Sequence, residues 1–427
     1  MNDPFEGVRE DLQRCNKCGT CASVCPTYGA LRRETTSARG RVSLIEGFLA
    51  GELAADDELH ELLYTCLSCH SCVPACPNGV RVDRLVLAAR AKLAEADGRS
   101  PWRQLIFKDL LPHPERLSAA LWPARGYQAL GLRTLVERVG LDRHLPGRLG
   151  IYSQMAPSVP FRPASRVLPT VSTALGPARG RVGYFLGCAQ NFVFPAAAKA
   201  TVALLNLAGF DVVTPPKTVC CGMPALAYGE RAVAREAARW NVNLFLSEGV
   251  ETLVTDCASC GSFLKEYGEL LTDDPEWAAK AADLSSRTRD IGEFLAANPP
   301  LTAASEAVPL RVTYHDPCHL AHAQGVKRQP RDLLRGIPGL ELVEMRTPGA
   351  CCGSAGSYGL MHPDVSTMIL DKRIGEAIET EARVIATACP ACRIQLEFGV
   401  RRAGHDARVR HVSELLAAAY GVQNSLA

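Results

Sequence analysis

One cysteine pattern occurs twice in the chain, as CNKCGTCASVCP at residues 15–26 and as CLSCHSCVPACP at residues 66–77. In each run, gaps of two, two and three residues separate four cysteines, and proline follows the last one. With this spacing, three thiolates on one short loop bind a [4Fe–4S] cluster, and the fourth usually ligates the other cluster of the pair. We therefore expect two cubane clusters, one held by Cys15, Cys18, Cys21 and Cys76, and the other by Cys66, Cys69, Cys72 and Cys25.

Zinc ribbons and disulfides are the alternative uses of so many cysteines. Zinc sites typically combine two Cys pairs rather than a compact run of four. Residues 1–15 are charged and contain no apolar stretch, so we expect no signal peptide. Eighteen cysteines without a secretion signal favour a reducing compartment and metal ligation over disulfides.

The remaining ten cysteines form two sets of five. From the first cysteine to the adjacent pair is 32 positions in one set and 33 in the other, and from that pair to the Cys-x-x-Cys is 36 and 37. Five thiolates exceed the four that tetrahedral zinc takes, so the pattern favours one further iron–sulfur cluster in each set. The expected ligands are Cys188, Cys220, Cys221, Cys257 and Cys260 in the first set, and Cys318, Cys351, Cys352, Cys389 and Cys392 in the second.

The composition limits the classes of protein to which the chain can belong. A length of 427 residues predicts two or three domains. The hydrophobic share of 47% and the charged share of 22% are ordinary for a soluble globular protein. A net charge of +2 gives no field that would attract nucleic acid, so no nucleic-acid partner is expected. No run of about 18 apolar residues occurs, so we expect no transmembrane segment.

The first part of the chain divides into two regions. Residues 1–100 are expected to form a helical two-cluster ferredoxin domain, because the long gap between the runs is helix-patterned over 40–63 and a second amphipathic helix follows residue 82. Residues 101–180 are a basic, proline-containing linker with 11 Lys or Arg against 4 Asp or Glu. The linker either docks on a partner subunit or an anionic membrane face, or is a solvated connector. Its scattered arginines favour the connector.

Residues 181–427 are an internal duplication with a period near 130, which we divide into cysteine-rich repeat 1 (181–305) and repeat 2 (306–427). In repeat 1 we expect strands at 181–186, 210–214 and 251–255, and helices near 196–208 and 229–247. Strands that alternate with helices predict a parallel sheet, and the cysteines follow the carboxyl ends of the strands, where open α/β sheets place their sites. Gly222 and Gly353 permit the turn that directs two adjacent cysteines to one site. The predicted fold class is α+β multidomain, with a helical ferredoxin domain followed by two duplicated α/β domains.

Four polar residues crowd around Cys318, namely His315, Asp316, His319 and His322. They could form a proton relay beside a cluster. The alternative, which we favour, is that they pack the cysteine loop and hydrogen-bond its sulfurs. No catalytic residue is assigned from the sequence.

The whole arrangement resembles a known family. Each five-cysteine set resembles the domain found twice in the catalytic subunit of heterodisulfide reductase, where it binds a non-cubane [4Fe–4S] cluster. Two such domains behind a two-cluster ferredoxin resemble the glycolate oxidase iron–sulfur subunit family. Related subunits of lactate and anaerobic glycerol-3-phosphate dehydrogenases are also similar. The stretches that carry the closer resemblance are Arg39–Arg41 with Leu44–Ile45, Gly187–Gln190, Lys265–Gly268, and Cys351–Tyr358 followed by His362–Asp364.

The resemblance implies an iron–sulfur electron-transfer subunit of a glycolate, or other 2-hydroxy acid, oxidase or dehydrogenase. It implies one non-cubane [4Fe–4S] cluster in each repeat beside the two cubanes. The sequence contains no GxGxxG, Walker loop or flavin fingerprint. Oxidation of a hydroxy acid needs a two-electron acceptor such as flavin, so we expect an FAD-containing flavoprotein partner. The isolated chain should then be inactive on the hydroxy acid.

Two further expectations concern the electron acceptor and the location of the chain, and one competing function remains. Electrons should pass to a quinone or another acceptor. The location should be cytoplasmic, with peripheral contact at the inner face of the cell membrane as a further option. The competing hypothesis is a reductase, related to heterodisulfide reductase or to the lactate and glycerol-3-phosphate enzymes, with its own reductase site at a non-cubane cluster.

Overall fold

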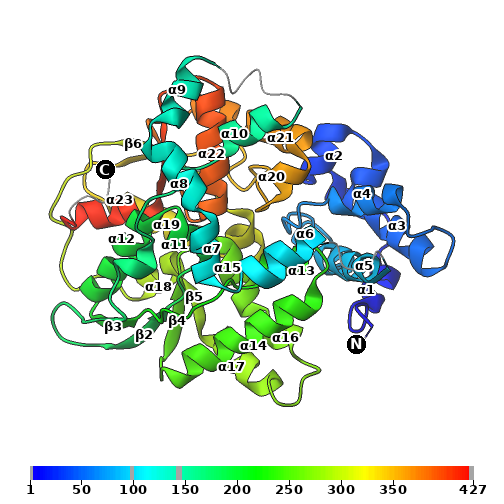
Figure 1. The fold of residues 1–427 in the computed structure, drawn as a ribbon, viewed down its shortest axis with the longest axis horizontal. Helices are drawn as coiled ribbons and strands as arrows, with labels where there is room; N and C mark the ends of the chain where they lie inside the picture. Colours follow the sequence, from blue (N-terminus) through cyan, green and yellow to red (C-terminus); the bar gives the residue numbers. More distant parts are fainter. Residues whose placement is uncertain (1–2, 97–100, 141–146, 423–427) are drawn as a thin grey trace.

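The computed structural model describes residues 3–96, 101–140 and 147–422 (Figure 1). Its first part is helical, as predicted. The two cysteine runs lie in loops and short turns between the helices, and Cys25 immediately precedes one of them. The helices are α1 (Arg9–Arg14), α2 (Pro26–Leu31), α3 (Ala38–Leu49), α4 (Asp57–Tyr64) and α5 (Val82–Ala96), with 3₁₀ turns at Thr20–Ala22 and Glu34–Thr36.

The segment 40–63, which the sequence predicts as one helical stretch, forms two helices. Gly51, two residues after the end of α3, has a positive φ of 76°, so the backbone cannot continue as a helix there. Asp56 then caps α4, because its side chain accepts a hydrogen bond from the amide of Leu59. The resulting bend lets α3 and α5 pack around a small core that includes Val42, Ile45 and Leu85. Cysteines of both runs lie against this core.

The linker is a series of short helices, several of which begin at proline. Near its end, β1 (Val171–Ser172) pairs antiparallel with β3 (Phe210–Val213) of the first sheet. The elements before it are α6 (Pro101–Arg103), a π-helix (Gln104–Leu110), α7 (Pro114–Ala120), α8 (Trp122–Ala129), α9 (Leu132–Arg138), α10 (Leu149–Met155) and a 3₁₀ turn (Ala164–Arg166).

Repeat 1 is an α/β unit around a sheet of order β1-β3-β2-β4-β5, parallel except for β1. Its parallel strands are β2 (Gly180–Tyr184), β3 (Phe210–Val213), β4 (Thr252–Thr255) and β5 (Thr288–Asp290). Its helices are α11 (Cys188–Phe192), α12 (Pro195–Leu207), α13 (Met223–Ala227), α14 (Arg231–Ser247), α15 (Ala258–Lys265), α16 (Tyr267–Leu270), α17 (Ala278–Arg287) and α18 (Ile291–Ala297).

Repeat 2 has the same strand order in a four-stranded parallel sheet, β7-β6-β8-β9. Its strands are β6 (Arg311–Tyr314), β7 (Glu341–Val343), β8 (Val384–Thr387) and β9 (Arg408–His411). Its helices are a π-helix (His319–Ala323), α19 (Arg328–Arg335), α20 (Tyr358–Met361), α21 (Pro363–Ile378), α22 (Pro390–Arg402) and α23 (Val412–Ala419). The parallel sheets and the duplication that the sequence predicts are therefore confirmed.

The two repeats pack reciprocally. Helix α12, the first long helix of repeat 1, contacts α23 at the end of repeat 2, and α19 contacts α18 in the equivalent way. Helix α15 likewise contacts the π-helix of repeat 2, and α22 contacts α11. This is a pseudo-twofold arrangement, so a residue close to the axis meets its own counterpart. Cys257 and Cys389, which follow the carboxyl ends of β4 and β8, meet in this shared region.

Candidate metal centres

Two cavities in the helical part are each lined by cysteines drawn from both runs. Cys15, Cys18, Cys21 and Cys76 line one cavity, which Cys72 also touches. Cys25, Cys66, Cys69 and Cys72 line the other. Each cavity thus receives three cysteines of one run and the last cysteine of the other, which is the exchange that the spacing predicts.

Buried cations beside the second cavity fit an anionic group. Arg41 is 1% exposed, and its guanidinium donates to the carbonyl of Thr36 at 2.7 Å and to the hydroxyl of Thr27 at 3.1 Å. Its Nη1 lies 4.0 Å from the sulfur of Cys25. Arg90 is 4% exposed and donates to the carbonyl oxygens of Leu63, at 2.9 Å, and Cys66.

Neither arginine has an ion pair with a carboxylate in the described part of the chain. Burial of a guanidinium without a counter-ion is expensive, and burial lowers the pKa of Arg90. An iron–sulfur cluster with thiolate ligands carries negative charge and would compensate both cations. The residues present at this cavity therefore fit the expected group.

The five cysteines of each repeat are in mutual contact. In repeat 1, hydrogen bonds between thiols link Cys188 to Cys220, Cys220 to Cys221, Cys221 to Cys260, and Cys260 to Cys257. In repeat 2, the equivalent bonds link Cys318 to Cys351, Cys351 to Cys352, Cys352 to Cys392, and Cys392 to Cys389. All except Cys188 and Cys318 are buried.

The second cysteine of the adjacent pair has a lowered pKa in both sets. Hydrogen bonds from Cys220 and Cys260 hold the pKa of Cys221 well below its usual value. Bonds from Cys351 and Cys392 do the same to the pKa of Cys352. The thiolate is the form that binds metal, so each set contains a thiol prepared for ligation. In repeat 1, hydrogen bonds with neighbouring thiols and burial raise the pKa values of the other four thiols. In repeat 2 the same causes raise the pKa values of Cys318 and Cys392, whereas hydrogen bonds with Cys257 and Cys392 hold the pKa of Cys389 well below its usual value.

Two further contacts join the sets to one another. The thiol of Cys257 is hydrogen-bonded to that of Cys389, its counterpart across the pseudo-twofold axis. The thiol of Cys69, in the second run, is hydrogen-bonded to that of Cys351 in repeat 2. The four cysteine sets therefore follow one order in space: first run, second run, repeat 2 and repeat 1. We refer to this succession as the thiol row. The sequence alone does not reveal this order, because both contacts are tertiary.

The polar residues around Cys318 hold loops together rather than bonding to sulfur. His319 donates from Nε2 to the carbonyl of Ser68 at 2.9 Å, and its Nδ1 lies 3.1 Å from the hydroxyl of Ser259. It therefore ties repeat 2 to the second run and to repeat 1. His322 donates from Nε2 to the carbonyl of Gly349 at 3.0 Å. Hydrogen bonds to the cysteine sulfurs from these histidines, as the sequence analysis favours, are absent from the described residues.

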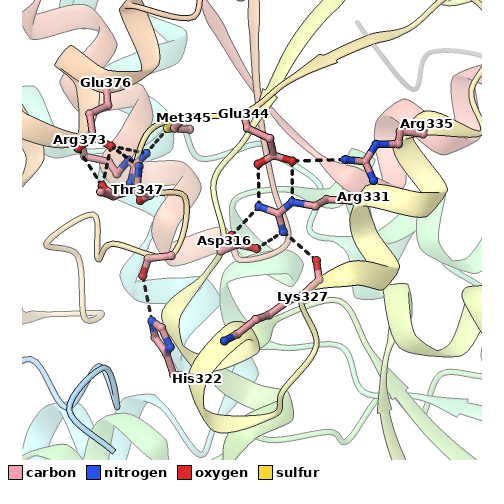
Figure 2. A network of polar contacts seen from close by, with 11 residues as sticks. Asp316, His322, Lys327, Arg331, Arg335, Glu344, Met345, Thr347, Arg373 and Glu376 are labelled. Carbon is pink, nitrogen blue, oxygen red and sulfur yellow. Dashed lines mark hydrogen bonds and ion pairs between the residues drawn. The ribbon is translucent and has the colours of Figure 1, made fainter. Parts of the chain in front are cut away.

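Asp316 takes part in a network that the sequence analysis did not identify (Figure 2). Arg331 donates two bonds of 2.8 Å to the carboxylate of Asp316 and bonds of 2.7 and 2.9 Å to Glu344. These ion pairs raise the pKa of Arg331 far above its usual value. Arg331 lies 13 positions after Cys318 and Glu344 lies 7 before Cys351, so only the fold brings them together.

His315 lies directly beside the repeat 2 cysteines. A ring nitrogen of His315 and the sulfurs of Cys352 and Cys392 lie within 4.8 Å of one another. Both ring nitrogens are buried without a hydrogen-bond partner in the described part of the chain, and burial lowers the pKa of His315 to about 3. A neutral imidazole with nothing to bond, next to two thiols, fits a bound metal or cluster. Repeat 1 has Phe185 at the equivalent position, so this feature is specific to repeat 2.

Comparison with known proteins agrees with this geometry. A "4Fe-4S dicluster domain" model matches residues 11–80, and a "Cysteine-rich domain" model matches 182–265 and 312–397. A fold and sites of this kind define an iron–sulfur oxidoreductase subunit. A model of the "Glycolate oxidase iron-sulfur subunit, linker region" matches residues 98–155.

Relatives match over almost the whole chain. The "Probable glycolate oxidase iron-sulfur subunit" of Bacillus subtilis is 36% identical, over 97% of this chain and 95% of its own length. The "Glycolate oxidase iron-sulfur subunit" of Escherichia coli is 30% identical, over 95% and 93%. The chain therefore belongs to the glycolate oxidase iron–sulfur subunit family.

Two more distant similarities extend the comparison. One subunit of the fumarate reductase (CoM/CoB) of Methanothermobacter marburgensis is 29% identical, over 96% of this chain and 72% of its own length. The crystal structure of a hypothetical protein from Helicobacter pylori aligns with a TM-score of 0.53 and 11% identity, over 98% of this chain and 73% of that one. This second similarity concerns the fold alone.

Proposed function

We propose that the chain is the electron-transfer subunit of a complex that oxidises glycolate or a similar 2-hydroxy acid. The observation that carries this proposal is the thiol row, in which four cysteine sets adjoin without interruption. The names of two relatives that match over almost their whole length, from Bacillus subtilis and Escherichia coli, support the substrate class. Iron–sulfur clusters held by these cysteines would supply one-electron carriers, two of them cubanes and one non-cubane in each repeat. An FAD-containing partner subunit would oxidise the hydroxy acid itself.

The two ends of the thiol row differ in exposure, which supports a direction. Cys18 in the first run is exposed, whereas the repeat 1 cysteines other than Cys188 are buried. We propose that the flavoprotein docks near the first run and that a quinone or another acceptor takes electrons on the side of the repeats.

Reduction of a dye by glycolate tests this function. The anaerobically loaded chain alone should give no glycolate-dependent dye reduction, because it supplies no flavin. Addition of the flavoprotein partner should restore it. Turnover by the pure, flavin-free chain would contradict the proposal. Reduction of a disulfide by the chain alone would instead favour the competing reductase, for which the similarity to the fumarate reductase (CoM/CoB) of Methanothermobacter marburgensis is the supporting observation.

We further propose a cytoplasmic location with peripheral contact at the inner membrane face. Among the described residues, no helix is long and apolar enough to cross a bilayer. Helices α8 and α9 and their ends expose large apolar side chains, with Leu130 76%, Val139 64% and Trp122 62% exposed. The linker around them is basic, which suits an anionic lipid surface. These exposed apolar side chains favour the membrane contact over the solvated connector that the scattered arginines alone indicate.

Flotation with vesicles checks this location. The chain should float with vesicles that contain anionic lipid and should remain behind with neutral ones. Replacement by serine of Leu132 and Leu135 in α9, and of Val139 just beyond its end, should weaken the binding. Equal flotation with neutral vesicles, or no effect of the triple substitution, would refute the membrane contact at this face.

A further inference from the structure

A cavity of about 500 Å³ opens beside the cysteines of repeat 2. One wall is the loop of Asp316, two residues before Cys318, and the opposite wall includes Gly349, two residues before Cys351. A molecule bound there would lie against both cysteine loops. The cavity has the size of sites that hold metabolite-sized ligands. Among its other lining residues are His322, Lys327, Arg331, Arg335 and Glu344.

The same place in repeat 1 is closed by the chain itself. The duplication makes Leu186, Asn191 and Thr218 the counterparts of Asp316, Ala321 and Gly349, and these three residues line a cavity of only about 20 Å³. Linker residues 165–170 fill the space. The amide of Ser165 donates to the side-chain oxygen of Asn191 at 2.9 Å, and the carbonyl of Thr170 accepts from Thr214 at 2.8 Å. One copy of the cavity is sealed and the other is open.

The open cavity carries a positive charge that the protein does not neutralise. Asp316 and Glu344 are both occupied by Arg331, which fixes the two walls relative to each other. Arg335 lies 3.6 Å from Asp332 and 3.8 Å from Glu344, and it shares Glu344 with Arg331. Lys327 has no carboxylate within ion-pair distance in the described residues. Figure 2 shows Lys327 extending into the space between His322 and the Arg331 network.

His322 adds no charge to this cavity. Its Nε2–H is engaged by the carbonyl of Gly349, and burial and the nearby Lys327 lower the pKa of its imidazole. The residues that line the open cavity therefore include three cations against two carboxylates, and among these cations Lys327 is the one without a carboxylate partner in the described part of the chain. In repeat 1, none of the counterparts that line the sealed cavity is charged.

We propose that this cavity binds a small organic carboxylate, whose anionic group pairs with Lys327 and has Arg335 beside it, and that repeat 2 alone carries the site. The volume favours an organic acid over a simple inorganic anion, because a phosphate would leave most of the space empty. The binding site itself follows from the cavity alone. Only the significance of a ligand bound next to the repeat 2 cysteines rests on the proposed electron-transfer function. The duplicated domains would then differ in role, since repeat 1 is sealed and repeat 2 meets the small molecule.

Isothermal titration of the full chain, loaded with iron and sulfide without oxygen, tests the proposal. The probe is isophthalate, because its two carboxylates are too far apart to chelate iron. We expect one saturable site. Lys327→Glu should weaken binding by about tenfold or more, because a like charge then faces the anion. Lys327→Arg should retain binding. The matched control is Lys217→Glu, beside the sealed cavity of repeat 1, which should change nothing.

A spectroscopic readout locates the site. Isophthalate should alter the electron paramagnetic resonance signal that Cys351→Ser plus Cys352→Ser removes, and should leave the cubane signals unchanged. The absence of saturable binding, equal binding by Lys327→Glu, or equally tight binding of inorganic phosphate would each overturn the proposal. Binding is measured without a flavoprotein, so failure of glycolate oxidation would leave this result intact, and the converse also holds.

Discussion

A chain that carries Cys351→Ser and Cys352→Ser is expected to lose about a quarter of its iron and to stop delivering electrons to the acceptor. A fully loaded chain should hold about sixteen iron atoms, four in each of four clusters, so loss of one site leaves about twelve. Cys351 is also the thiol that meets Cys69 of the second run. The double substitution therefore removes one site and interrupts the thiol row between the helical part and both repeats.

The matched variant is Cys220→Ser plus Cys221→Ser, at the equivalent position of repeat 1. It should lose the same amount of iron, yet leave the row intact as far as Cys389. Iron and acid-labile sulfide analysis and glycolate-dependent dye reduction with the flavoprotein partner distinguish the two. If each variant keeps the wild-type iron content, or if the repeats contain zinc without sulfide, the cysteine sets of the repeats are structural.

Cys25→Ala should damage the cluster of the other run and leave its own run's cluster in place. Cys25 lines the cavity of Cys66, Cys69 and Cys72. Without that cluster, Arg41 and Arg90 would remain buried with only neutral hydrogen-bond acceptors around them. Leaving a buried charge uncompensated costs about 3–5 kcal/mol, so we expect a lower melting temperature as well as a loss of about four iron atoms.

Cys76→Ala is the crossed control for Cys25→Ala. It should remove the cluster from the cavity that Cys15, Cys18 and Cys21 line. This cavity lies at the exposed end of the row and away from Arg41. Its effect on stability should therefore be the smaller of the two. Spectra in which each substitution affects only the cluster of its own run would exclude the exchange of ligands.

The sequence predicts the elements of the repeats closely, because their signals are local. The expected strands at 210–214 and 251–255 correspond to Phe210–Val213 and Thr252–Thr255, and the expected helix near 229–247 to Arg231–Ser247. Alternating apolar runs and glycine turns are sufficient to define such elements. The break between α3 and α4 also has a local signal, Gly51 followed by the capping Asp56, which the apolar pattern conceals.

The arrangement of the sites depends on contacts that have no signature along the chain. Nothing in the spacing of Cys257 and Cys389 indicates that the repeats meet at this pair, because the pseudo-twofold axis arises from helix packing. The Arg331 network and the closure of repeat 1 by residues 165–170 are likewise tertiary. Sequence spacing therefore predicts which residues belong to a set, and packing decides which sets adjoin.

The contact between Cys257 and Cys389 has a consequence for assembly of the protein. These two thiols are hydrogen-bonded across the interface, and the hydrogen bonds of Cys389 with Cys257 and Cys392 lower its pKa, so Cys389 is the better nucleophile for oxidation. Exposure of the empty chain to oxygen would close a disulfide that staples the repeats and removes one ligand from each at once. Delivery of iron and sulfide must therefore precede contact with oxidants, and a non-reducing gel of aerobically prepared chain would show the cross-link as faster migration.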